Sequence, residues 1–200
     1  YTAFYTLSLH DALPIFYQAY ANAPLLFEVR GLETPKHMNA AVGCIIHCEG
    51  GHILVPDYNT AIAFDREGRE IKKWSGSEDH FANFISAVKS RKSTDLHADI
   101  LEGHLSSGLC HTGNISYRLG QKKSREELDA ALKSDAALTE SFGRMAEHLA
   151  ANHVDLTATP ATLGMPLTMD PVTETFPGND AANALLTRPA RAPFVVPEKA

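Results

Sequence analysis

The 200-residue sequence is short of the features that mark several specialised classes of protein. Its three cysteines, at positions 44, 48 and 110, form no recognisable disulfide framework, and their odd number favours a reducing compartment. The 18 lysines and arginines are outnumbered by 24 aspartates and glutamates and form no basic block, so a nucleic-acid partner is not expected. No apolar run approaches the roughly 18 residues of a membrane span, so no membrane partner is expected either.

Two kinds of ligand-binding motif are also missing. No G-x-G-x-x-G follows a predicted strand, so the sequence contains no phosphate-binding turn for a dinucleotide. His47, Cys48 and His52 lack the paired C-x-x-C spacing of a structural zinc site, and we predict no metal. What remains is ordinary: 44% of residues are hydrophobic and 21% charged, as in globular domains that bury a sizeable core.

Residues 1–15 stand apart from the rest of the chain. The segment 6–15, TLSLHDALPI, resembles the translation of a common short-read sequencing adapter. We therefore interpret residues 1–15 as an assembly artefact, with native sequence from Phe16 onward and the native N-terminus lost upstream. The alternative is a genuine amphipathic leader.

Short apolar runs separated by turn residues predict antiparallel strands in the first half of the chain. The turn segments 49–51 and 65–68 each lie between two such runs, and Gly68 is suited to a positive φ. The predicted strands cover residues 25–32, 43–48, 52–56, 60–65 and 70–74.

Helical spacing of apolar residues dominates after residue 78. Helices are predicted over 78–90 and 98–119, then after a capping box at Ser124 and Glu127, and finally around position 145. The first helix is expected to bury Phe81, Phe84, Ile85 and Val88, and the last to bury Leu138, Phe142, Met145 and Leu149.

Prolines recur beyond Pro160, which predicts an extended tail over 156–200 that packs on the domain formed by residues 16–155. The predicted fold class is α+β: an open, mainly antiparallel sheet with helices packed on one face.

Three stretches, in order and covering nearly all of the chain after residue 16, together resemble the Gfo/Idh/MocA oxidoreductases, in particular the bacterial branch with an extended C-terminal tail. The first is GGHILVP at 50–56. The second comprises DHFANF at 79–84, LEGHLSS at 101–107, CH at 110–111 and GNISYR at 113–118. The third comprises NALLTRP at 183–189 and RAPF at 191–194.

The resemblance implies the C-terminal α/β domain of an enzyme whose Rossmann domain binds NAD or NADP. In this family the C-terminal α/β domain supplies a substrate-facing sheet. The resemblance also implies a homo-oligomer that forms through the same sheet. The intact enzyme would transfer hydride between the nicotinamide and a hydroxyl carbon of a sugar, polyol or related compound. The family's Glu-Lys-Pro lysine motif is absent here, and its acidic-and-histidine pair is not identifiable, so no catalytic residue is assigned and the chain alone is expected to be inactive.

One polar stripe is the candidate substrate-binding site. His104, Ser107, His111 and Asn114 follow one another at helical spacings of three, four and three, beside an arc of leucines. Imidazole and amide groups on this stripe could hydrogen-bond a polyol. Glycines at 103, 108 and 113 suggest close approach of a ligand or another backbone. The alternative is a close-packed helix whose polar groups are satisfied within the chain.

Other chemically suggestive residues have simpler explanations. Cys110 and His111 are adjacent on a helix, point about 100° apart and cannot readily form a nucleophile–base pair. Trp74 is expected in packing or an interface rather than under a sugar ring. Arg188 and Arg191 are expected to anchor the tail, although they could also clamp an anion.

The resemblance leaves two questions of function open. A non-enzymatic carbohydrate-binding or assembly module is the alternative to part of a dehydrogenase. The compartment is open as well: the cytoplasm is favoured, but some relatives carry twin-arginine leaders for export.

Overall fold

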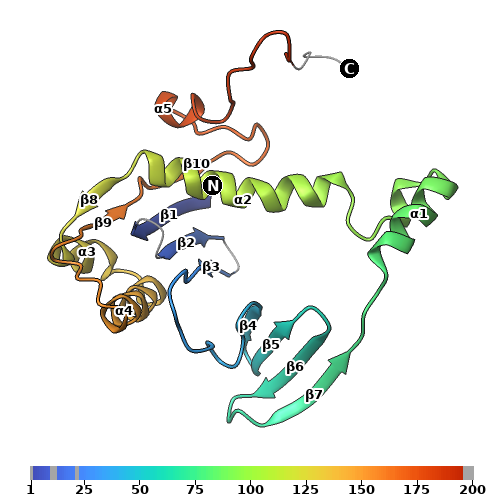
Figure 1. Cartoon of the computed structure of the whole chain (residues 1–200), viewed down its shortest axis with the longest axis horizontal. Coiled ribbons are helices and arrows are strands. Elements are labelled where there is room, and N and C mark those ends of the chain that lie inside the picture. The colour runs from blue at the N-terminus through green and yellow to red at the C-terminus, as the bar shows by residue number, and fades with distance from the viewer. Residues whose placement is uncertain (1, 10–12, 21–22, 196–200) are drawn as a thin grey trace. The chain divides into compact units, whose positions relative to one another are not determined.

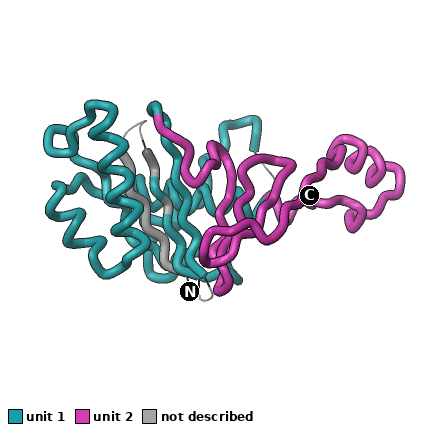
Figure 2. The backbone as a smooth tube through the Cα atoms, turned by 90° about the horizontal axis from the view of Figure 1, so that it is seen from below, with its two compact units in different colours: residues 1–33, 104–200 teal, residues 34–103 magenta. Residues whose placement is uncertain are grey.

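The chain forms two compact units, seen here in a computed structural model that describes residues 2–9, 13–20 and 23–195 (Figure 2). Unit 1 comprises residues 1–33 and 104–200, and unit 2 comprises residues 34–103. Each unit has its own antiparallel sheet. The strands therefore divide between two sheets, where the sequence predicted one.

The sheet of unit 1 has the strand order β3-β2-β1-β9-β8, and β10 also pairs with β1 (Figure 1). Its strands in the described part of the chain are β1 (Thr2–Leu9), β2 (Leu13–Ala19), β3 (Leu25–Glu28), β8 (Gln121–Lys123), β9 (Ala161–Leu163) and β10 (Leu167–Met169). β3 and β8 are the edges of this order. β9 lies between β1 and β8, so part of the segment 156–200 belongs to the sheet.

Helix α4 (Ala136–Ala151) supplies most of the core of unit 1. Its four predicted core residues, Leu138, Phe142, Met145 and Leu149, are all buried, which confirms the sequence prediction. They form one cluster with Ile15 and Tyr17 of β2 and with Leu128 and Leu132 of α3 (Arg125–Leu132). Asp135 caps α4 through the Leu138 amide and also accepts a hydrogen bond of 2.7 Å from the Tyr17 hydroxyl. The helix is thereby joined to the sheet by polar as well as apolar contacts.

The capping box predicted at the start of α3 is present. The Ser124 hydroxyl accepts from the Glu127 amide, and the Glu127 carboxylate accepts from the Ser124 amide. Two backbone donors that helix geometry leaves unpaired are thus satisfied.

A second core cluster of unit 1 lies between α2 and the C-terminal segment. Helix α2 (Ile100–Arg118) contributes Ile115, which is buried with Leu167 of β10, Phe176, and Ala182 of the short helix α5 (Asp180–Asn183). The Ser116 hydroxyl donates to the Met165 carbonyl at 2.9 Å. These contacts hold residues 165–185 against α2.

Unit 2 contains a four-stranded antiparallel meander of β4 (Cys44–Cys48), β5 (Gly51–Asp57), β6 (Thr60–Asp65) and β7 (Glu70–Ser75). The two predicted hairpin turns are confirmed. Gly51 has φ +149°, and a Cβ there would lie 2.0 Å from the Phe64 carbonyl oxygen. Gly68 has φ +78°. Both positions therefore require glycine or strongly favour it.

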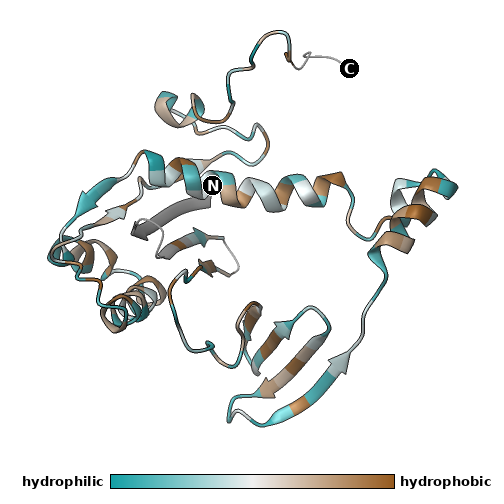
Figure 3. Cartoon of the chain, in the orientation of Figure 1, coloured by the Kyte–Doolittle hydropathy of each residue, from teal (hydrophilic) through white to brown (hydrophobic). Residues whose placement is uncertain are grey.

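The first predicted helix is present as α1 (His80–Ser90), but its predicted buried face is wrong. Phe81, Phe84, Ile85 and Val88 are all exposed, and Figure 3 shows apolar residues along this helix. Within unit 2, α1 packs on the 3-10 turn η1 (Ser93–Asp95), through the Asn83 side chain and the Asp95 carbonyl. η1 consists of the polar residues Ser93, Thr94 and Asp95, so it offers little apolar surface for the helix to cover.

The α+β class predicted from the sequence is confirmed, with antiparallel sheets and helices in one chain. β1 and part of β2 consist of residues from the segment 1–15, of which residues 1 and 10–12 lie outside the described residues. The interpretation of this segment as a translated adapter concerns its origin and stays a prediction.

Deletion of residues 1–12 tests whether β1 is part of the native sheet. β1 pairs with β2, β9 and β10, so its loss should abolish the cooperative urea unfolding of unit 1 followed by circular dichroism. An unchanged unfolding midpoint would show that the sheet does not need β1.

A pair of phenylalanine substitutions tests the two helix faces. Phe142 is 2% exposed, so Phe142→Ala should lower the free energy of unfolding by about 3–5 kcal/mol. Phe81 is 72% exposed, so Phe81→Ala should change it by no more than about 0.5 kcal/mol. Equal losses in urea denaturation would contradict the assignment of α1 as an exposed helix.

Candidate functional site

The four predicted site residues do form one stripe on α2. His104, Ser107, His111 and Asn114 are all exposed, and the neighbouring arc of the helix buries Thr112, Ile115 and Ser116 among other residues. The helix is continuous from Ile100 to Arg118, so the stripe is a straight row of polar groups in unit 1. Their role in substrate binding stays a prediction.

His104 is held by a carboxylate from the C-terminal segment. Its Nε2 lies 2.8 Å and 2.9 Å from the two carboxylate oxygens of Glu174. Glu174 has φ +52°, an uncommon conformation for a residue with a side chain. Because both side chains are more than half exposed, this pair contributes at most about 1 kcal/mol to stability.

The turn that carries Glu174 is ordered by its own hydrogen bonds. The Asp170 carboxylate accepts from the Val172 amide at 2.8 Å, and the Asp170 amide donates to the Thr175 carbonyl at 2.9 Å. The hydrogen bond from the Val172 amide is the main cause that lowers the pKa of Asp170. The Glu174 carboxylate is thus presented to His104 by a preformed turn.

The other three residues of the stripe differ in whether their side chains form hydrogen bonds. Ser107 donates from its hydroxyl to the His104 carbonyl at 3.1 Å, as helical serines often do. His111 and Asn114 make no side-chain hydrogen bond to any residue of the described chain. Their imidazole and amide groups are therefore open to solvent and to a ligand.

Two glycines of α2, Gly103 and Gly108, do not mark a close approach of another backbone. A Cβ at Gly103 or Gly108 would meet no atom of the described chain within 4 Å. Gly113 is buried. The expectation of a neighbouring backbone is therefore wrong at Gly103 and Gly108, where the helix surface is open.

Two histidines of unit 2, His47 and His52, lie together without forming a metal centre. His47 and His52 are directly opposite on β4 and β5, with ring centroids 6.4 Å apart, and His52 stacks on Phe64 at 4.9 Å. The Cys48 thiol lies 3.7 Å from the Ile46 carbonyl. Among the described residues, no group of three or more His, Cys, Asp or Glu side chains is placed to hold a metal ion.

The other residues singled out from the sequence have surface positions. Cys110 is exposed. Trp74 is partly exposed, with the Lys72 ammonium 5.0 Å from its ring. Arg191 lies 5.7 Å over the ring of Phe194, a contact within the C-terminal segment, and Arg188 is exposed.

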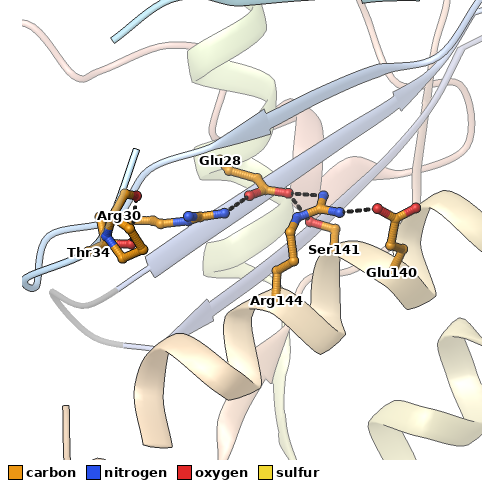
Figure 4. Close-up of polar contacts among 7 residues, drawn as sticks. Glu28, Arg30, Thr34, Glu140, Ser141 and Arg144 are labelled. Atoms are coloured by element: carbon orange, nitrogen blue, oxygen red, sulfur yellow. Dashed lines mark hydrogen bonds and ion pairs between the residues drawn. The ribbon is translucent and has the colours of Figure 1, made fainter. Parts of the chain in front are cut away.

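Sequence analysis missed a polar cluster where α4 meets the edge strand β3 (Figure 4). The Glu28 carboxylate accepts hydrogen bonds from Arg30 at 2.9 Å, from the Ser141 hydroxyl at 2.6 Å, and from Arg144. Arg144 also pairs with Glu140, one turn earlier on α4. We call Glu28, Arg30, Ser141 and Arg144 the Glu28 cluster.

The charge of the Glu28 carboxylate is compensated by the two guanidinium groups that bind it. Burial by itself would raise the pKa of Glu28, but the hydrogen bonds from Arg144, Ser141 and Arg30 outweigh it and hold that pKa below its ordinary value. Glu28 therefore stays ionised down to acid pH. The only sequence signal was the spacing of Ser141 and Arg144 on the apolar face of α4, because Glu28 is more than 110 positions away.

No known protein family, curated protein or solved structure matches this chain. In the described part of the chain, none of the helices is both long and apolar enough to cross a membrane.

Substitution of Gly108 tests the open surface of α2. Gly108→Ala should raise the free energy of unfolding by about 1 kcal/mol, because alanine restricts the unfolded chain and its methyl group meets no neighbour. Urea denaturation measures the change, with Gly103→Ala as the matched second variant. A loss of stability in either variant would indicate a packed neighbour at that position.

Proposed function

We propose that this chain is the substrate-binding and oligomerisation portion of a Gfo/Idh/MocA-like, NAD(P)-dependent oxidoreductase acting on a sugar, polyol or related hydroxy compound. By itself the chain is inactive. The proposal rests first on a resemblance to that family, which is carried by the segments 50–56, 79–84, 101–107, 110–111, 113–118, 183–189 and 191–194.

The observation that supports substrate binding is the exposed polar stripe of α2. With Nε2 of His104 engaged by Glu174, Nδ1 is the ring nitrogen that would meet a substrate hydroxyl. His111 and Asn114 continue the row with groups that both donate and accept hydrogen bonds. A polyol presents hydroxyl groups in series, and this row matches that chemistry.

The residues present do not fit a nicotinamide cofactor. Dinucleotide phosphates bind where a glycine-rich turn leads from a parallel strand into a helix N-terminus. The paired strands of the described chain are antiparallel, and the glycine turns at 49–51 and 68 join hairpin strands. We therefore assign NAD or NADP, and with it hydride transfer, to another part of the parent enzyme.

One observation favours the alternative of a non-enzymatic carbohydrate-binding or assembly module. The meander of unit 2 exposes Ile46, Ile71 and Trp74, apolar residues of the kind that association buries. A homo-oligomer through this sheet is compatible with both functions. Sequencing the source DNA upstream of Phe16 separates them, because a dehydrogenase requires a glycine-rich turn and a lysine motif in the same reading frame.

A ligand titration tests the site in the chain as it exists. Neutral monosaccharides and cyclic polyols, added to the full chain, should shift the NMR signals of α2, and His111→Ala or Asn114→Ala should each weaken binding about fivefold, the equivalent of one hydrogen bond. The control substitution is His153→Asn, because His153 is an exposed histidine just after α4. NAD and NADP should give no binding heat in calorimetry.

Two results would contradict the proposal separately. Equal weakening in the His153→Asn control, or no shift on α2 with any polyol, would remove the substrate role of the stripe. Micromolar binding of NAD or NADP would show that the chain holds the cofactor without a further domain.

A further inference from the structure

His148 is a buried histidine next to the Glu28 cluster. It lies on α4 one turn after Arg144 and two turns after Ser141, on the face that packs on the sheet. The residue is 7% exposed, and its Nε2 has no hydrogen-bond partner in the described structure. A second buried atom of this face, Nε of Arg144, also lacks a partner among the described residues.

The charged groups near His148 come from several elements. The segment from β3 onward contributes Glu28 and Arg30, which pair with each other at 2.9 Å. Helix α4 contributes Arg144, which is bound to the same carboxylate.

Polar and charged groups further from His148 also have interaction partners. At the C-terminal end of α4, the side-chain amide of Asn152 donates to the backbone carbonyls of Glu33 and His148. At the other end, α3 places Arg125 over the ring of Phe142, and β2 directs Tyr17 to Asp135. The carboxylate of Glu28 is therefore already shared between two guanidinium groups, and the Glu140 carboxylate, which is 75% exposed, is paired with Arg144.

We propose that protonation of His148 releases helix α4 from the edge strand β3, which makes this junction of unit 1 a proton-sensitive latch. An imidazolium there adds a third cation beside Arg30 and Arg144, which already share the Glu28 carboxylate, while the exposed Glu140 carboxylate pairs with Arg144. It is also shielded from water, so its charge is not compensated by solvation. Separation of α4 from β3 relieves both costs.

The direction of the pH effect follows from the two states. Burial and, secondly, the charge of Arg30 lower the pKa of His148 in the folded chain. Below its ordinary value of 6.5, the open or unfolded chain binds a proton that the closed chain does not, so stability falls as the pH falls. Glu28 acts in the same direction below its ordinary value of 4.5, where the open chain becomes protonated first.

Hydrogen exchange of the full chain tests the latch. The pH is lowered from 7.5 to 5.5, and the rates are corrected for intrinsic exchange. The opening equilibrium constant of amides in β3 and in the facing turns of α4 should then rise about tenfold. Tenfold is the limit for one histidine that has its ordinary pKa in the open state. His148→Gln should remove this rise. His153→Asn, a matched substitution of an exposed histidine, should keep it.

Three outcomes would overturn the proposal. A rise that persists in His148→Gln would assign the effect to other groups. A rise that is equal over the whole of unit 1 would indicate global acid destabilisation instead of local release. If His148→Gln does not fold, the imidazole resonance of His148 in the unmodified chain decides: a titration midpoint at or above 6.5 would exclude the latch.

Discussion

The packing of α4 on β2 is the contact on which the rest of unit 1 depends. Phe142, Met145 and Leu149 are withdrawn from water against Ile15 and Tyr17, and burial of each such side chain contributes about 1.5–3 kcal/mol. The same contact brings Ser141 and Arg144 to Glu28, whose desolvation is unfavourable unless donors replace water. Apolar burial therefore sets the geometry, and the polar cluster fixes how the helix meets the sheet edge.

The two functional proposals use different helices of unit 1 and different degrees of burial. The stripe on α2 is exposed, with His104 oriented by Glu174, so it suits contact with a hydroxylated ligand. His148 on α4 is buried beside the guanidinium groups of Arg30 and Arg144, so it suits a response to protons and not ligand binding. The same side-chain chemistry thus has two roles, decided by access to water.

Much of the fold could be predicted from local patterns, with instructive exceptions. The hairpin turns, the capping box at Ser124 and the apolar face of α4 depend on neighbouring residues, and all are confirmed. The exposed face of α1 could not be predicted, because periodicity shows that a helix has an apolar side but not whether a partner covers it. The short strands β8, β9 and β10 were missed, because three residues carry too little pattern.

The sequence by itself determined the α+β class, most of the longer helices and hairpins, and the polar stripe from His104 to Asn114, because these follow from spacings of a few residues. Only the tertiary structure decided that Glu174 meets His104 across 70 positions, and that Glu28 meets Ser141 across 113. It also decided that His148 is buried and His111 exposed, although both are helical histidines. The physical reason is that burial and ion pairing depend on which distant segments pack together, and no local spacing encodes that choice.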